Sequence, residues 1–136
     1  MIVVDTNIIA YLVIQGEKTP LALKAVRKDP VWAAPFLWRS EFRNVLCGYI
    51  RRQMLSIQNA RELMTHALQR MIGREYQVIS DQVLDLAASS TCSAYDCEFV
   101  ALALELGVPL VTVDKHILEQ FPRVAMGAFQ FVSEPG

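Results

Sequence analysis

The amino-terminal segment Ile2-Val3-Val4-Asp5-Thr6-Asn7 constrains the fold most. Its three β-branched residues predict a short buried strand. From Ile8 to Val13 the apolar residues continue in a helical pattern, so the strand ends at Asp5. A strand followed at once by a helix is typical of an open parallel α/β sheet, which binds ligands at the carboxyl ends of its strands. Taken alone, however, Asp5 is more simply explained as the cap of that helix.

The rest of the chain alternates helices and strands in the same way. Apolar residues at helical spacing, together with capping residues, predict helices over residues 20–28, 35–52, 57–72, 80–88, 94–106 and 115–121. Short apolar runs predict strands over residues 31–34, 76–79 and 110–113, and a last, edge strand over 128–132. Strands separated by helices pair in parallel, with helices on both faces. The predicted fold is therefore a three-layer α/β/α sandwich around a central, mainly parallel sheet.

Length and cysteine content favour a single domain in a reducing compartment. The chain has 136 residues, and we expect one domain over residues 1–132 followed by a flexible tail over 133–136. Its three cysteines include no C-x-x-C pair, which predicts free thiols rather than disulfides or a zinc site. An acid already occurs at position 5, so we expect no signal peptide, and charged residues interrupt the longest apolar run. We therefore expect a cytoplasmic protein without a membrane segment.

The balance of charged and apolar residues bears on partners. The net charge is −1, so any affinity for nucleic acid must come from a local basic patch. Hydrophobic residues make up 53% of the chain, which suggests that a partner covers some apolar surface. Apolar residues continue beyond what one sheet face needs, and from them we predict a homodimer and a groove for a partner segment: Leu46, Tyr49, Ile50, Met54, Leu55 and Leu63.

Four acidic residues occupy strand ends and helices in a way that points to a site. Asp114 follows the strand over 110–113 as Asp5 follows the first, so neighbouring strands would present both carboxylates at one edge. Asp96 lies in the first turn of the helix over 94–106, where it could also be a cap. Glu41 lies among apolar residues and needs either an arginine partner, such as Arg39 or Arg43, or a place in a site.

Convergence of these acids would create a site for a hard cation. Two carboxylates about 4 Å apart repel by about 4 kcal/mol at a partly screened dielectric, which a divalent cation can offset. A site of carboxylates without His or Cys ligands selects Mg²⁺ or Mn²⁺. Such an ion can activate water and stabilise charge on a phosphoryl oxygen. No serine or cysteine has a nearby base, so the implied chemistry is hydrolysis of a phosphodiester by metal-activated water.

The order and spacing of these motifs resemble those of the PIN domain family, and within it the VapC-type toxin ribonucleases of toxin–antitoxin pairs. The resemblance covers nearly the whole chain and is carried by Asp5-Thr6-Asn7, Glu41-x-x-Asn44-Val45-Leu46, Tyr95-Asp96, Leu104-Glu105-Leu106-Gly107 and Leu110-Val111-Thr112-Val113-Asp114. It implies a metal-dependent endoribonuclease that forms homodimers and is inhibited by a small antitoxin. It also implies an acidic site made of Asp5, Glu41, Asp96 and Asp114, with Asn7 and Thr112 as supporting residues.

Within that site we expect Asp5, Asp96 and Asp114 to bind the ion directly, and Glu41 to act through water or to orient the nucleophile. Arg39 and Arg43 are the candidates for contacts with RNA phosphates, if either faces the site. Arg51 and Arg52 are better explained as a solvated helix face. The substrate should be single-stranded or looped RNA, whose bases can be splayed into a pocket.

Three other interpretations remain open. The chain could be a PIN-like RNA-processing nuclease that is not a toxin. A non-catalytic binding module of the same fold should have lost one of the acids, and none is missing here. A receiver or aspartyl-phosphate domain is the weakest alternative, because Asp5 is followed by Thr6 and Asn7 rather than by a second acid.

Overall fold

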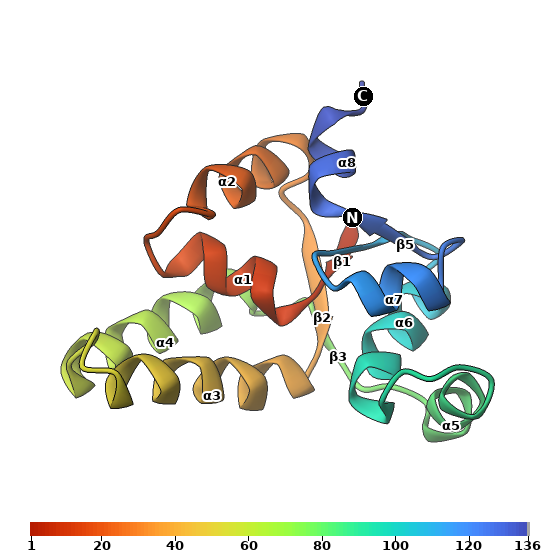
Figure 1. Cartoon of the computed structure of the whole chain (residues 1–136), viewed down its shortest axis with the longest axis horizontal. Helices are drawn as coiled ribbons and strands as arrows, with labels where there is room; N and C mark the ends of the chain where they lie inside the picture. Colours follow the sequence, from red (N-terminus) through yellow and green to blue (C-terminus); the bar gives the residue numbers. More distant parts are fainter. Residues whose placement is uncertain (136) are drawn as a thin grey trace.

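A single parallel sheet organises residues 1–135, which are the residues that the computed structural model describes (Figure 1). The strands are β1 (Ile2–Val4), β2 (Trp32–Pro35), β3 (Glu75–Tyr76), β4 (Leu110–Thr112) and β5 (Ala125–Gly127). They lie in the order β3-β2-β1-β4-β5, and every neighbouring pair is parallel. The predicted α/β fold with a central parallel sheet is therefore confirmed.

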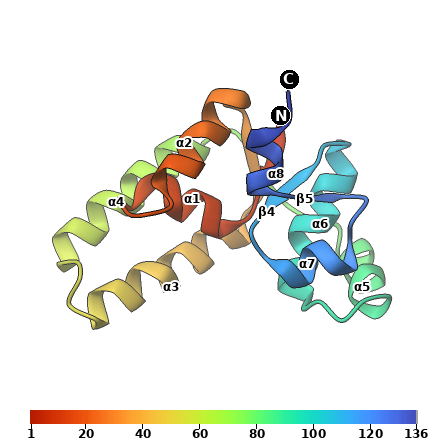
Figure 2. The ribbon, with the colours of Figure 1, turned by 45° about the horizontal axis from the view of Figure 1, so that its top comes forward.

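Helices cover both faces of this sheet. They are α1 (Thr6–Val13), α2 (Thr19–Lys28), α3 (Leu37–Arg51), α4 (Ile57–Met71), α5 (Ser80–Ala88), α6 (Ala94–Leu106), α7 (Lys115–Gln120) and α8 (Ala128–Ser133). Figure 1 shows α1 to α4 on one side of the strands and α5 to α7 on the other. In Figure 2, α3 and α4 extend away from the sheet as a pair. The space between α3 and α6, at one edge of the sheet, is where the site lies.

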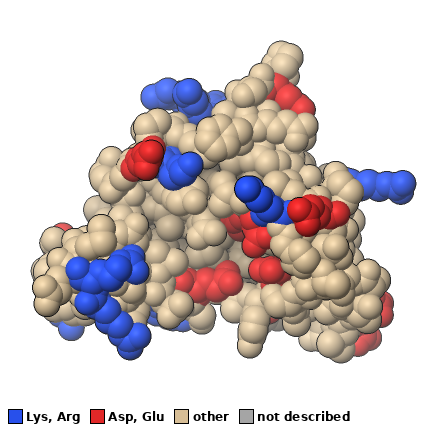
Figure 3. All heavy atoms as spheres, viewed as in Figure 1, with Lys and Arg blue, Asp and Glu red and all other residues tan. Residues whose placement is uncertain are grey.

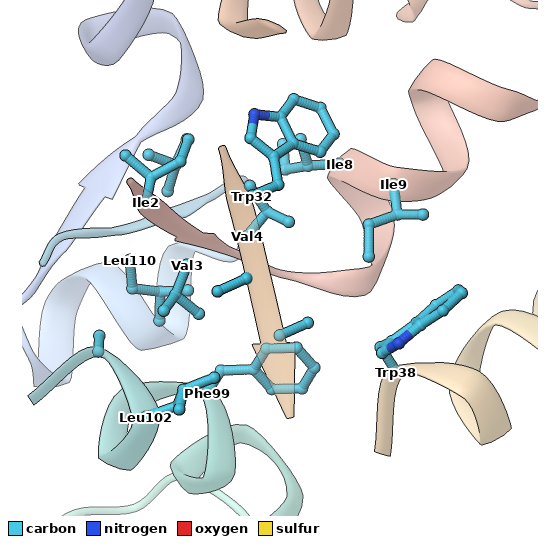
Figure 4. Packing of buried hydrophobic residues seen from close by; sticks show 14 of the residues in the cluster. Ile2, Val3, Val4, Ile8, Ile9, Trp32, Trp38, Phe99, Leu102 and Leu110 are labelled. Atoms are coloured by element: carbon cyan, nitrogen blue, oxygen red, sulfur yellow. The ribbon is translucent and has the colours of Figure 1, made fainter. Parts of the chain in front are cut away.

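The core fills the space between the sheet and each helical layer. The residues of β1 are almost completely buried, as expected for a central strand covered on both faces. Figure 4 shows Val3 and Leu110 near Phe99 and Leu102 of α6, while Ile9 lies toward Trp38 of α3. Helix α6 contacts β1, β2 and β4, and six of its 13 residues are apolar and buried. This packing fixes the orientation of the helix that carries Asp96.

Helix ends follow the predicted capping signals. The side chains of Ser56 and Ser93 accept hydrogen bonds from the backbone N–H groups of Asn59 and Asp96, which caps α4 and α6. Gly107 ends α6 with a φ of 67°, a left-handed conformation that favours glycine. The boundaries of the predicted helices therefore hold to within about two residues.

The last predicted strand is wrong. Residues 128–132 form most of helix α8, and the edge strand β5 lies just before it, pairing Leu110 with Ala125. An alternating strand would place Phe129 and Phe131 on one face, but Phe131 is buried and Phe129 is exposed. Ala128 and Phe131, three residues apart, form the buried face of a helix instead. The apolar run was too short for periodicity to distinguish the two structures.

Smaller differences concern strand limits and the carboxyl terminus. Pro35 ends β2 rather than starting the following helix, and β3 covers only Glu75–Tyr76. Ser133, where a loose tail was predicted to begin, is the last residue of α8, and Gly136 lies outside the described residues. The three cysteines are free, as predicted. Within residues 1–135, no helix has the length and apolarity needed to cross a bilayer.

Candidate active site

The strand order creates the position of the site. The chain leaves β1 for β2 on one side and later returns to β4 on the other side of β1. Connections that diverge in this way open a crevice at the carboxyl ends of the central strands. Asp5 directly follows β1, and Asp114 follows β4 after one intervening residue. The two acids therefore reach the same edge of the sheet.

A cavity of about 420 Å³ lies at this edge, between α3 and α6. Acidic, polar and apolar side chains line it: Asp5, Thr6, Asn7, Leu37, Ser40, Glu41, Asn44, Val45, Tyr95, Asp96, Phe99, Asp114 and Ile117. Figure 3 shows acidic side chains gathered around a hollow in this face of the molecule. The structure thus brings together all four acids predicted from the sequence, and Asn7 with them.

Asp5 has both of the roles considered from sequence. It is the N-cap of α1, accepting a hydrogen bond from the backbone N–H of Ile8 at 3.1 Å, and it also lines the cavity. Its other carboxylate oxygen accepts hydrogen bonds from the Thr112 hydroxyl and from the backbone N–H of Val113 at 3.2 Å. Burial raises the pKa of Asp5, although these hydrogen bonds oppose the rise. The carboxylate is therefore fixed in place at a cost in solvation.

Thr112 holds the Asp5 carboxylate from the buried side, away from the cavity. It is completely buried and is not among the residues that line the cavity. Besides donating to Asp5, its hydroxyl accepts a hydrogen bond from the backbone N–H of Asp114 at 3.0 Å. Thr112 therefore connects the two acids that follow β1 and β4, and acts on the cavity through them.

Glu41 faces the cavity, and its partner is not an arginine. Its carboxylate accepts a hydrogen bond of 2.7 Å from the hydroxyl of Thr6. Partial burial raises the pKa of Glu41, and the negative charges of Asp96 and Asp5 add to the rise, whereas the Thr6 hydrogen bond opposes it. Of the two alternatives that the sequence left open for Glu41, a place in a site fits the structure and an arginine partner does not. Thr6 was missed from sequence, although its position next to Asp5 was a usable signal.

The two arginines considered for RNA phosphates do not line the cavity. Arg39 forms a two-pronged ion pair with Glu75 of β3, at 2.6 and 2.7 Å, and Glu75 also accepts a hydrogen bond from the Trp38 ring nitrogen. This ion pair holds the pKa of Glu75 below its usual value. Arg43 donates to the Ser40 hydroxyl at 3.1 Å, and is therefore one contact away from the cavity wall.

Asp96 and Asp114 complete the acidic wall from two different helices. Ser93 is the cap of α6, so the cap interpretation of Asp96 is not needed. Burial raises the pKa of Asp96, and the nearby charge of Asp114 raises it further. Asp114 is itself the N-cap of α7, with one carboxylate oxygen accepting from the backbone N–H groups of His116 and Ile117 at 2.8 and 3.1 Å. Glu98, left out of the predicted set, does not line the cavity.

The donor set suits a hard divalent cation. Four carboxylates around one cavity provide oxygen ligands, with no histidine or cysteine among the lining residues. Burial raises the pKa of Glu41 and of Asp96, and repulsion from neighbouring carboxylates adds to both rises. A bound cation would relieve that repulsion. As placed within residues 1–135, no three His, Cys, Asp or Glu side chains are close enough to form a metal site. The residues therefore fit the ion in chemistry, while hydrogen bonds hold Asp5 at the start of α1, Asp114 at the start of α7, and Glu41 against Thr6 of α1.

Comparison with known proteins agrees with the fold. The model of the PIN domain matches residues 2–125, so this chain belongs to the PIN domain family. Ribonuclease VapC3 of Pyrobaculum aerophilum is 28% identical over 124 residues, which covers 89% of this chain and 95% of that protein.

Two solved structures have the same fold as this chain. The crystal structure of PAE2754 from Pyrobaculum aerophilum has a TM-score of 0.76 at 20% identity, covering 96% of this chain and 92% of that one. A toxin–antitoxin complex from Klebsiella pneumoniae contains a chain with a TM-score of 0.68 at 15% identity, covering 96% of this chain and 99% of that one.

Proposed function

We propose that this protein is a metal-dependent endoribonuclease that hydrolyses RNA phosphodiesters with water as the nucleophile, and that it is the toxin of a toxin–antitoxin pair. The observation that carries the proposal is the lining of one cavity by Asp5, Glu41, Asp96 and Asp114 in a member of the PIN domain family. The name of the VapC3 relative supports the ribonuclease activity. The Klebsiella complex supports an antitoxin partner.

The four acids would have different tasks. Asp5, Asp96 and Asp114 would bind Mg²⁺ or Mn²⁺, since they come from three elements that meet at the edge of the sheet. When bound, the ion lowers the pKa of water and stabilises charge on a phosphoryl oxygen. Glu41, held by Thr6, would orient the attacking water or accept its proton. Its raised pKa makes it a stronger proton acceptor than an ordinary glutamate.

The polar residues around the acids would support this arrangement. Thr112 holds the Asp5 carboxylate from the buried side, which limits the orientations that Asp5 can adopt. Asn7 and Asn44 line the cavity with amide groups that can donate hydrogen bonds to phosphate or base oxygens. Arg43 is the better placed of the two arginines for a phosphate at the rim, because Arg39 is occupied by Glu75.

An RNA cleavage assay with purified protein tests this proposal. Wild-type protein should cut single-stranded RNA in Mg²⁺ or Mn²⁺ and leave 5′-phosphate and 3′-hydroxyl ends, as direct attack by water does. Asp5→Asn, which preserves the cap of α1, and Asp5→Ala should both lose cleavage, while Glu75→Gln, outside the cavity, should retain it. Cleavage that survives EDTA would reject the role of the ion. Products with 2′,3′-cyclic phosphate ends would show that the ribose hydroxyl was the nucleophile.

A further inference from the structure

The acidic cavity has an apolar wall that hydrolysis by water does not explain. Leu37 and Val45 of α3 line one side, and Tyr95 and Phe99 of α6 line another. No lysine or arginine is among the lining residues that the structure describes. A polyanion approaching this cavity therefore meets repulsion from the carboxylates, and the apolar wall can add favourable contacts to those of the Asn7 and Asn44 amides.

Tyr95 is the unusual member of this wall. The largest aromatic side chains of the protein, Trp32 and Trp38, are completely buried, whereas Tyr95 is 64% exposed although it lines the cavity. It lies in the first turn of α6, and the buried residues of that helix begin only at Cys97. Packing of the core therefore does not require an aromatic ring at this position. An exposed aromatic ring beside a cavity is a surface on which a planar group can stack.

We infer that Tyr95 is a stacking platform for an unpaired nucleobase next to the phosphate that is cut. This inference rests on the proposed ribonuclease function and specifies its substrate class. Tyr95 and Asp96 line the same cavity, so a base stacked on the Tyr95 ring would lie beside a phosphate held at the acids. Proteins that bind single-stranded RNA commonly stack bases on aromatic side chains, and every base has a π-face for this contact.

The arrangement selects against duplex RNA. In a double helix both faces of each base are covered by its neighbours, so a base can reach Tyr95 only from a single strand, a loop or a bulge. Asn44 of α3 also lines the cavity, and its amide can pair with the edge of the stacked base. Because stacking depends little on base identity, Tyr95 favours unpaired RNA over duplex RNA more than it favours one base over another.

The experiment compares loss of the ring with loss of the base. A short single-stranded RNA with one mapped cleavage site is prepared intact and with an abasic residue on either side of that site. Removing one base–aromatic stack should lower kcat/KM about 5- to 150-fold. We expect wild type to show this fall in kcat/KM on one of the two abasic RNAs. Tyr95→Ala should show the same fall on intact RNA, and its kcat/KM should fall no further on that abasic RNA. Tyr95→Phe, which keeps the ring, should behave as wild type.

The matched control is Phe129→Ala. Phe129 is 63% exposed, almost as much as Tyr95, but it lies on α8 outside the cavity, so this variant should cleave as wild type does. The inference is overturned if Tyr95→Ala cuts the abasic RNA with a kcat/KM lowered by the product of the two separate losses. The base would then not stack on Tyr95, while the ribonuclease function would stand.

A binding measurement keeps the inference testable if no RNA is cut. Single-stranded RNA carrying 2-aminopurine is titrated with protein in Mg²⁺, and stacking is followed as quenching of its fluorescence. Quenching by wild type and Tyr95→Phe, but not by Tyr95→Ala, would support the platform even if the proposed hydrolysis fails. Equal quenching by all three proteins, or none by wild type, would overturn it.

Discussion

The hydroxyl of Thr112 on β4 donates a hydrogen bond to the carboxylate of Asp5 at the end of β1. The same hydroxyl accepts from the backbone N–H of Asp114, so one buried side chain connects the acids that follow two neighbouring strands. A second contact of this kind, from Thr6 to Glu41, connects α1 with α3. The acidic wall is thus held by neutral hydroxyl groups, which fix the carboxylates without neutralising them.

Thr112→Val removes this hydroxyl with little change in shape. Because the substitution leaves a buried carboxylate oxygen with one fewer donor, we expect the free energy of unfolding to fall by about 1–3 kcal/mol. Loss of a partner that orients a metal ligand lowers metal affinity or activity by about 10- to 100-fold, and we expect a loss of that size in cleavage. Urea denaturation and the RNA cleavage assay measure the two effects.

Thr112→Ser is the control for this prediction. It keeps the hydroxyl but deletes a buried methyl group, which costs about 1 kcal/mol. We expect this variant to lose stability and retain most of its activity. Equal loss of activity in the serine and valine variants would show that packing at Thr112, rather than its hydrogen bond to Asp5, supports the site.

Asp96→Asn should stabilise the metal-free protein at neutral pH. Burial and the charge of Asp114 raise the pKa of Asp96, so the folded state loses stability as pH rises and this carboxyl ionises. An asparagine at position 96 does not ionise, so its folded state loses no stability as pH rises. The substitution also preserves the first turn of α6, which Ser93 caps. The gain should shrink as pH falls and vanish below about 4, the ordinary carboxyl value, because the acid is then protonated in both states. Thermal melts of both proteins across this pH range, in EDTA, measure it.

The same variant separates structure from activity. Removing a ligand should lower cleavage by more than about 100-fold, since partners of metal ligands alone contribute about 10- to 100-fold. A folded and stabilised but inactive Asp96→Asn is the expected combination. If the variant unfolds in EDTA at neutral pH, Asp96 supports the helix rather than a site.

Mg²⁺ or Mn²⁺ should raise the melting temperature of wild type. An ion that binds only the folded state at ten times its Kd adds about 1.4 kcal/mol, which corresponds to a shift of a few degrees for a domain of this size. The shift should be smaller in Asp96→Asn and unchanged in Glu75→Gln, whose carboxylate lies outside the cavity. No shift in wild type at millimolar metal would count against an ion site among these acids.

Association into a homodimer remains a prediction, and the structure reduces the number of residues that could form its interface. Leu46, one of the apolar residues from which the homodimer was predicted, is buried in the core and is therefore excluded from an interface. Met54, at the turn between α3 and α4, is 62% exposed and stays a candidate. We expect wild type to sediment as a dimer on the order of tens of micromolar, a range typical of modest interfaces. Met54→Glu should shift it toward monomer, whereas Leu84→Glu on α5 should not. A wild-type monomer at this concentration would refute the dimer.

The sequence alone determined the alternation of strands and helices, the limits of most helices and the identity of the acids. These properties are local: β-branched runs favour strands, serine and glycine fix the ends of α4 and α6, and an acid directly after β1 is visible in the chain itself. The same local rules failed at residues 128–132, where a five-residue segment with four apolar residues is compatible with a strand or a helix. Packing of Phe131 into the core decides for α8.

Tertiary structure decided which side chains meet and what holds them. The order β3-β2-β1-β4-β5 brings Asp5 and Asp114 to one edge, and no local pattern encodes which strands are neighbours. Contacts between residues far apart in the chain made Thr6 the hydrogen-bond partner of Glu41 and Glu75 the ion-pair partner of Arg39. Arg39 is nevertheless closer to Glu41 in sequence than Thr6 is. The exposure of Tyr95 and the burial of Leu46 also became visible only after packing. Hydrogen bonds and burial depend on distance in space, which the order of residues constrains only over a few positions along one element.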